Sequence, residues 1–206
     1  MITKVKELNV IICGVGGQGV VLMSELLGHA AVHDGLRIRG SEVLGMAQRG
    51  GAVFSNIRIG SEVHAPLTPE GRCDILVALE PSEALRNINF MSKSSLIILN
   101  TRKVVPYTVY IGESKYPPLE EILKRLHKAV KEVIAMDAAQ IAVEAGNLQS
   151  TNVVMLGALF GTEQMPINIE TIKAIIQERF PAKVAAVNIK AFDLGYNLSK
   201  KMLIST

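Results

Sequence analysis

Short apolar runs alternate along this chain with segments whose apolar residues recur every three or four positions. The runs predict buried strands, and the periodic segments predict amphipathic helices. Strands are expected at residues 8–13, 36–39, 52–59, 74–79, 95–99, 109–111 and 133–136. Helices are expected at residues 17–33, 81–90, 119–130, 138–145, 153–160, 169–180 and 187–202. This alternation predicts a single Rossmann-like α/β domain, whose mostly parallel sheet carries helices on both faces.

Composition narrows the classes of function. The chain has 206 residues, of which 49% are hydrophobic and 20% are charged, so it can bury a substantial core. Its formal charge of +3 is scattered and only 4% of residues are aromatic, which argues against a nucleic-acid partner. No apolar run reaches the roughly 18–20 residues that would span a membrane. Lys4 and Lys6 precede an apolar stretch as in a signal peptide, but glycines from residue 14 onward interrupt it, which favours a cytoplasmic protein.

A glycine-rich segment, GVGGQG at residues 14–19, follows the first predicted strand and opens the first predicted helix. In α/β proteins this order presents backbone N–H groups and a helix N-terminus to a phosphate. The amide of Gln18 adds a group that both donates and accepts hydrogen bonds. Two interpretations stay open: a loop that holds a phosphate, alone or across an interface, and a tight turn that only lets strand and helix pack closely.

The same segment satisfies the GxGxxG pattern of nicotinamide-binding folds, which is weak evidence by itself. Such sites usually have an acidic residue about 20 positions later, at the end of the second strand. Here Arg37 and Arg39 come first, and Glu42 lies beyond the predicted strand end. A free-standing NAD(P)-dependent dehydrogenase is therefore an alternative that the sequence disfavours.

A second glycine-rich segment, GMAQRGG at residues 45–51, is more unusual. Arg49 is followed by two glycines, so the backbone there is free to approach another surface, and its guanidinium suits a phosphate or carboxylate. A solvated loop arginine is the plainer alternative. The ligand-binding residues expected from the two segments together are Gly14, Gly16, Gly17, Gln18, Gly19, Gln48, Arg49, Gly50 and Gly51.

Other reactive side chains do not assemble into a catalytic apparatus. Cys13 and Cys73 are expected to be buried thiols, and two cysteines cannot hold an iron–sulfur cluster by themselves. His29 and His33 share a helix face at metal-pair spacing, but no third ligand is evident, and no metal site is predicted. Glu80 ends a buried strand, where α/β sheets gather ligands, although a carboxylate there is more often the cap of the next helix.

The chain resembles the gamma-type subunits of 2-oxoacid:ferredoxin oxidoreductases, and within them the small (beta) subunits of the indolepyruvate enzymes. The resemblance covers nearly all 206 residues, so residues 1–206 are identified as one pyruvate/ketoisovalerate oxidoreductase gamma-type catalytic domain. Its specific part is the pair of glycine segments in series. The supporting motifs are IICGVGGQGVV, SEVLGMAQRGG, DILVALEPSEALR, NVVMLGAL, and Asn188, Ala191, Phe192 and Gly195 in a late N-x-x-A-F-x-x-G pattern. One departure is Leu44, where the family often has histidine.

The resemblance implies a subunit of an enzyme that converts an aryl 2-oxoacid, coenzyme A and oxidised ferredoxin into an acyl-coenzyme A, carbon dioxide and reduced ferredoxin. It also implies that thiamine diphosphate, magnesium and 4Fe–4S clusters reside on a larger (alpha) partner subunit. The isolated chain is then expected to be inactive, and a homodimer is one candidate for its oligomeric state. A subunit that only stabilises its partner is a further alternative.

Overall fold

The computed structural model describes residues 5–45 and 50–204, which form one six-stranded sheet with the strand order β2-β3-β1-β4-β5-β6. The strands are β1 (Leu8–Val15), β2 (Ile38–Leu44), β3 (Ala52–Ile59), β4 (Cys73–Ala78), β5 (Met91–Asn100) and β6 (Glu132–Met136). Strands β1, β4, β5 and β6 run parallel, whereas β3 is antiparallel to both β1 and β2. The expected mostly parallel α/β sheet is confirmed.

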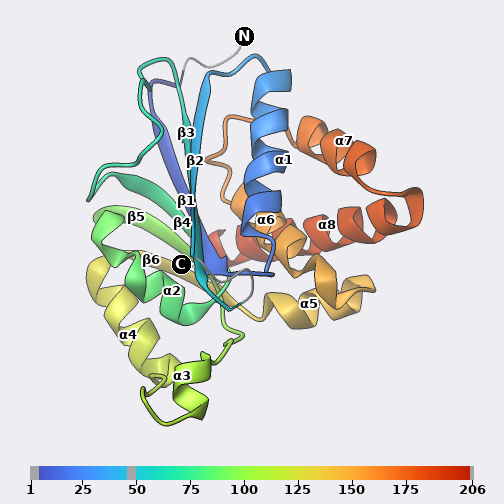
Figure 1. Cartoon of the computed structure of the whole chain (residues 1–206). Coiled ribbons are helices and arrows are strands. Elements are labelled where there is room, and N and C mark those ends of the chain that lie inside the picture. Colours follow the sequence, from blue (N-terminus) through green and yellow to red (C-terminus); the bar gives the residue numbers. More distant parts are fainter. Residues whose placement is uncertain (1–4, 46–49, 205–206) are drawn as a thin grey trace.

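Helices cover both faces of this sheet (Figure 1). One face packs against α1 (Val20–His33), α5 (Ala138–Ala145), α6 (Thr151–Gly161), α7 (Ile169–Arg179) and α8 (Ala182–Ile204). The other face packs against α2 (Pro81–Arg86) and α4 (Leu119–Ala129), with a short 3-10 turn at Ile88–Phe90 between α2 and β5. A second 3-10 turn, Leu148–Ser150, leads into α6. Among the described residues, no helix is both long and apolar enough to cross a membrane.

Helices α6 and α8 cross so closely that their backbones touch. A Cβ atom added at Gly157 would overlap the backbone of Phe192, and one added at Gly195 would overlap the carbonyl oxygen of Val154. Phe192 is fully buried in the core, and Asn188 accepts a hydrogen bond of 2.7 Å from the Ser150 hydroxyl. The late Asn-Ala-Phe-Gly pattern of the sequence is therefore a helix-packing motif.

Several predicted elements differ from the structure. The strand expected at residues 36–39 is β2, which begins at Ile38 and extends to Leu44. Because β2 is an edge strand with mostly exposed side chains, no apolar run marks its second half. The strand expected at residues 109–111 is wrong: this region holds the short helix α3 (Tyr107–Tyr110), which lies apart from the sheet. The helix expected to begin at residue 187 begins at Ala182.

The topology identifies where ligands are expected. From β1 the chain passes through α1 to the β2–β3 hairpin on one side, and then crosses to β4 on the other side of β1. The carboxyl ends of β1 and β4 therefore flank a switch point, which is the usual ligand crevice of open α/β sheets.

Candidate functional site

The first glycine loop connects β1 to α1 at this switch point. Gly19 is the residue before the helix and has a left-handed backbone (φ 84°, ψ 26°) that glycine adopts without strain. A Cβ at Gly19 would also overlap the side-chain amide of Asn152, the buried second residue of α6. Among the described residues no side chain caps α1, so the first N–H groups of this helix are available to a ligand.

Gln18 fixes the shape of this loop from within. Its side-chain oxygen accepts a hydrogen bond of 2.7 Å from the N–H of Val15, and its side-chain nitrogen donates one of 3.1 Å to the carbonyl of Leu79. Gly14 leaves the space that this side chain occupies, since a Cβ there would stand 2.8 Å from the Gln18 oxygen. Both polar atoms of Gln18 are thus engaged within the chain, which gives it a positioning role in the loop.

The structure brings the two glycine segments together. The N–H of Gly16 donates a 2.8 Å hydrogen bond to the carbonyl of Gly51, and the N–H of Gly50 donates a 3.4 Å bond to the carbonyl of Gly16. Two loops that lie more than 30 positions apart in the sequence are therefore one structural unit. Gln48 and Arg49 of the second segment lie outside the described residues.

A cavity of about 580 Å³ opens beside this pair of loops. Its described lining is mostly glycine backbone and valine or leucine side chains, and comprises Val15, Gly16, Gly17, Gly19, Val20, Val21, Leu22, Glu25, Leu44, Gly45, Val53 and Arg179. Arg179, at the end of α7, forms an ion pair of 3.2 Å with Glu25 of α1 at this cavity. Such a lining suits a ligand with an apolar portion and an anionic end next to the start of α1.

Arg179 is the site residue that the sequence did not identify. In the sequence it is an ordinary basic residue in the last turn of a helix, where the dipole favours a cation. Only the packing of α7 along α1 carries it to the cavity. No local pattern could have found it.

Glu80 is a structural residue, as the plainer interpretation of the sequence held. Its carboxylate is fully buried and caps α2 by accepting bonds from the N–H groups of Ser82 and Glu83, at 2.7 and 3.1 Å. The other oxygen accepts a 3.2 Å bond from the N–H of Val104 and a bond from the hydroxyl of Tyr116. Burial and this contact with Glu80 raise the pKa of Tyr116 far above its usual value, so the phenol stays protonated and donates.

Asn100 links the ends of the neighbouring strands. Its side-chain nitrogen donates a hydrogen bond of 3.0 Å to the carbonyl of Leu79, which also accepts a bond from Gln18. Its side-chain oxygen accepts a hydrogen bond of 3.1 Å from the N–H of Ala138. The first glycine loop, the end of β4, the end of β5 and the start of α5 are therefore joined by one series of hydrogen bonds. This series makes the floor of the switch point rigid.

The described residues do not fit an iron–sulfur cluster or a metal ion. Cys13 and Cys73 are both buried, and burial raises the pKa of each thiol well above its usual value, so neither is present as a thiolate ligand. Within the described ranges, no group of three or more histidine, cysteine, aspartate or glutamate side chains could hold a metal ion.

The topology also weighs against the nicotinamide-dependent alternative. In a dinucleotide-binding fold the acidic ribose ligand ends a parallel strand next to β1. Here β2, the strand that follows α1, is separated from β1 by the antiparallel strand β3, and the parallel neighbour of β1 is β4 on its other side. Glu42 lies inside β2, where it lines a small recess with Ser24 and Gly28 of α1.

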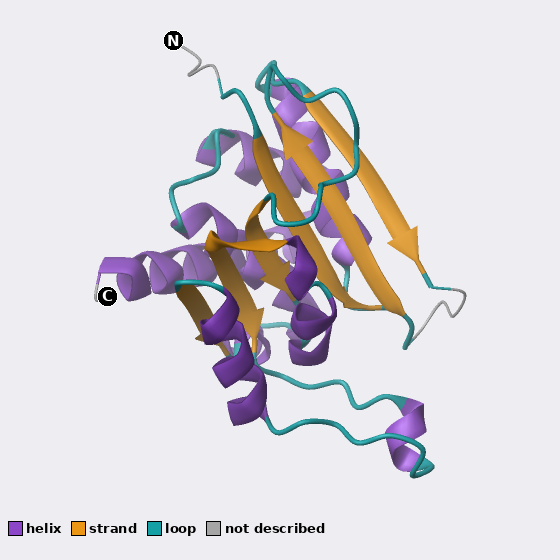
Figure 2. Cartoon of the chain, turned by 90° about the vertical axis from the view of Figure 1, so that its left-hand side faces the viewer, coloured by secondary structure: helices purple, strands orange, loops and turns teal. Residues whose placement is uncertain are grey.

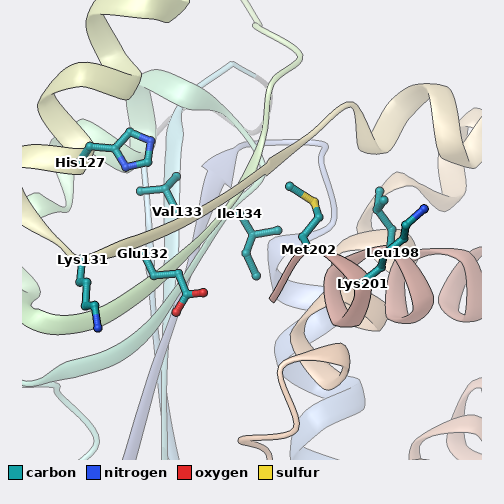
Figure 3. A pocket seen from close by; sticks show the side chains of 8 residues that line it. All are labelled: His127, Lys131, Glu132, Val133, Ile134, Leu198, Lys201 and Met202. Carbon is teal, nitrogen blue, oxygen red and sulfur yellow. The ribbon is translucent and has the colours of Figure 1, made fainter. Parts of the chain in front are cut away.

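A separate cavity of about 420 Å³ lies at the opposite edge of the sheet, along β6 (Figure 3). His127 and Val133 lie on one side of this strand, whereas Ile134 faces Leu198 and Met202 of α8 on the other. This cavity shares no residue with the glycine-loop cavity. It lies away from the switch point, so the glycine-loop cavity is the candidate site.

Comparison with known proteins identifies the family of this chain. Residues 9–198 match the family model described as pyruvate ferredoxin/flavodoxin oxidoreductase. The chain belongs to this oxidoreductase family. Within it, the chain is 47% identical to the indolepyruvate oxidoreductase subunit IorB of Archaeoglobus fulgidus, over 93% of this chain and 94% of that protein. It is 29% identical to the pyruvate/ketoisovalerate oxidoreductases common subunit gamma of Pyrococcus furiosus, over 89% of this chain and 92% of the other.

The fold recurs in solved structures of the same oxidoreductases. The 2-oxoglutarate:ferredoxin oxidoreductase from Magnetococcus marinus superposes with a TM-score of 0.73 at 22% identity, covering 96% of this chain and 32% of the other. The matched fold is thus about a third of a longer chain there. The family predicted from the two glycine segments is confirmed, and the chain is a small subunit of a 2-oxoacid:ferredoxin oxidoreductase.

Proposed function

We propose that this chain is the small subunit of an indolepyruvate:ferredoxin oxidoreductase that acts in the cytoplasm. The choice of indolepyruvate as the substrate rests on the difference in sequence identity between two branches of one family. Identity is 47% to an indolepyruvate oxidoreductase subunit and 29% to a subunit shared by pyruvate and ketoisovalerate enzymes. The complex would convert an aryl pyruvate and coenzyme A into the aryl-acetyl-coenzyme A and carbon dioxide, and pass two electrons to ferredoxin.

The redox chemistry belongs to a larger alpha subunit in this proposal. Thiamine diphosphate with magnesium supplies the carbanion chemistry when bound, and 4Fe–4S clusters carry the electrons. The described residues of this chain do not fit the clusters or the magnesium ion: both cysteines are buried with raised pKa values, and the described part contains no set of metal ligands. The small subunit would complete the site rather than contain it.

The paired glycine loops are the part of this chain that we assign to a ligand. No described side chain caps the start of α1, and its first residues line the 580 Å³ cavity, whose side chains are mostly apolar. A phosphorylated group of coenzyme A or thiamine diphosphate would lie against the N–H groups of these first residues. The residues that carry this role are Gly14, Gly16, Gly17, Gly19, Gly50 and Gly51, with Gln18 as the internal brace and Gln48 and Arg49 as the polar contacts of the second loop.

Reconstitution with the larger subunit tests the function. The two purified subunits should reduce viologen in a coenzyme A-dependent manner, with indolepyruvate preferred over pyruvate, 2-oxoglutarate and branched-chain 2-oxoacids. Neither subunit alone should be active. A larger subunit that kept full activity without this chain would instead assign it a stabilising role, and tight NADPH binding by the isolated chain would favour the dehydrogenase alternative.

The charge of Arg49 is tested in the same complex. Arg49→Ala should raise a Michaelis constant or lower turnover by about tenfold or more, because a lost ionic hydrogen bond costs roughly 1.5–3 kcal/mol. Arg39→Ala is the matched control, since Arg39 is an exposed arginine on β2. Unchanged turnover and unchanged Michaelis constants in Arg49→Ala would remove the charge role.

A further inference from the structure

The connection between β5 and α4 forms a projecting arm, residues 101–118, that leaves the body of the molecule and returns (Figure 2). Its tip is α3, and both tyrosines of that helix are turned to solvent: Tyr107 is 74% exposed and Tyr110 is 75% exposed. Ile111, at the end of α3, is 47% exposed. Long connections of this kind in compact domains usually have a function.

The tip keeps its shape through its own hydrogen bonds. The carbonyl of Thr108 accepts bonds from the N–H groups of Glu113 and Ser114, at 2.9 and 3.1 Å, and the hydroxyls of Thr108 and Ser114 are 2.8 Å apart. A tip held in this way loses little freedom when it binds another surface. Tyrosine is also one of the residue types that are enriched among the hot spots of protein interfaces.

Glu80 fixes the base of the arm. One oxygen of this buried carboxylate accepts bonds from Val104 on the outgoing limb and from the hydroxyl of Tyr116 on the returning limb. The preceding residue, Leu79, accepts the bond from Gln18 of the first glycine loop. The arm and the candidate site are therefore anchored to adjacent residues, and both leave the carboxyl edge of the parallel strands.

The charge of the arm defines the surface that it fits. Arg102, Lys103 and Lys115 are exposed, and Glu113 is the one acidic side chain of the arm. Between the limbs is a cleft of about 640 Å³, which Arg102 and Lys103 line together with Tyr116, Thr101 and prolines 81, 117 and 118. A cationic cleft beside an aromatic tip is complementary to an acidic, partly apolar protein surface.

We propose that the arm is the element through which this chain docks onto the larger oxidoreductase subunit. Tyr107, Tyr110 and Ile111 enter an apolar pocket of that subunit, and an acidic segment of it lies against Arg102 and Lys103. This inference rests on the proposed function, because it takes its partner from there. Docking on this side would close the larger subunit over the carboxyl edge, where the paired glycine loops lie.

The test measures the affinity of the purified larger subunit for variants of the full chain. Tyr107→Ser with Tyr110→Ser should weaken binding by about 100-fold, since each tyrosine has the properties of an interface hot spot. Arg102→Glu with Lys103→Glu should slow association and make it less dependent on salt. Tyr116→Phe, which removes the hydroxyl that donates to Glu80, should weaken binding by a smaller factor of about 3–10.

Matched controls separate docking from folding. Val32→Ser with Val143→Ser removes two side chains that are 65% and 53% exposed on α1 and α5, away from the arm, and should leave the affinity within about threefold. Lys124→Glu with Lys128→Glu reverses two exposed charges on α4 and is the control for the Arg102 and Lys103 variant. The variants at exposed positions should unfold at the wild-type urea midpoint, because each altered side chain is on the surface, whereas the half-buried Tyr116→Phe is read against its own measured midpoint.

The outcomes distinguish this inference from the proposed function. Wild-type affinity in the tyrosine variant would overturn the docking role, and aryl-oxoacid oxidation by the wild-type pair would still support the function. A wild-type pair that binds through the arm but oxidises no aryl 2-oxoacid would overturn the function alone. If sedimentation shows a homodimer of the isolated chain that the tyrosine variant dissociates, the arm binds a second copy and the inference is wrong.

Discussion

Glycine is used in two different ways where α6 meets its neighbours, α8 and the first glycine loop. Along the helix, Gly157 meets α8 so closely that two backbones are in contact, and the crossing is entirely buried. At its start, Asn152 packs on Gly19 of the first glycine loop, which borders an open cavity. The first use removes side-chain volume so that the core can close. The second use gives the backbone a left-handed shape that leaves N–H groups accessible.

The comparison shows why intolerance of a side chain at a glycine does not by itself identify a ligand site. Gly195 and Gly19 are both intolerant of a side chain, but only Gly19 combines this with an uncapped helix and a cavity. Substitutions at the helix crossing should therefore change stability, and substitutions in the loop should change stability less and activity more.

Gly195→Ala should have the largest effect on stability. The new methyl group would overlap the Val154 carbonyl, so α6 and α8 would have to separate, at a cost of about 3 kcal/mol or more. Urea unfolding of the isolated chain measures this loss of free energy of unfolding. Gly28→Ala is the control: Gly28 lies inside α1 with open space around it, so alanine there should stabilise the chain by about 0.5–1 kcal/mol. Equal effects at the two positions would contradict the packing argument.

Gly19→Ala should destabilise the chain by about 1–3 kcal/mol and reduce turnover of the reconstituted complex. The cost has two parts: the left-handed backbone and the overlap with Asn152. Gly17→Ala separates them, because Gly17 also has a positive φ, of 99°, but has no atom within 4 Å of the added Cβ. If Gly17→Ala cost as much free energy of unfolding as Gly19→Ala, contact with Asn152 would be unimportant.

Gln18→Leu should cost about 1–2 kcal/mol, because it removes the bonds to Val15 and Leu79. Gln18→Glu keeps the acceptor for the Val15 N–H but loses the donor to Leu79. Its free energy of unfolding should lie between those of the wild type and Gln18→Leu. Amide hydrogen exchange at Val15 reports the loop directly: exchange should accelerate in Gln18→Leu and less so in Gln18→Glu. Unchanged exchange in both variants would show that the side chain does not hold the loop.

Asp34, at the far end of α1, should give the smallest effect and none on turnover. Burial acts to raise the pKa of Asp34, but bonds from the Thr171 hydroxyl and the Asn168 N–H outweigh it and lower that pKa. A lowered pKa means that this carboxylate stabilises the fold above its usual pKa and ceases to do so as the pH falls through the lowered value. Asp34→Asn should reduce the free energy of unfolding by less than about 1 kcal/mol at neutral pH.

A pH series of urea unfolding checks this expectation. The difference between the wild type and Asp34→Asn should disappear in acid, below the lowered pKa of Asp34. A difference that persisted there would place the stabilisation in packing rather than in the charge. Loss of turnover in Asp34→Asn would show that α1 transmits changes from its far end to the glycine loop.

Much of the fold followed from local pattern because the central strands are buried on both faces. β4 and the second half of β5 are continuous apolar runs, and the glycine turn between β1 and α1 marks its own position. Prediction failed where burial no longer selects the residue type. β2 is an exposed edge strand, and α3 lies on the arm, so neither carries the periodicity that identifies an element.

The sequence by itself determined the α/β class, both glycine segments and the family, because these depend on neighbouring residues and on motifs with fixed spacing. Tertiary structure alone decided that Gly16 and Gly51 bond to each other, that Arg179 reaches the cavity, and that Glu80 holds the two limbs of the arm. The reason is physical: each of these contacts joins segments far apart in the chain. Their meeting is set by the strand order and by how the helices pack, which no local pattern specifies.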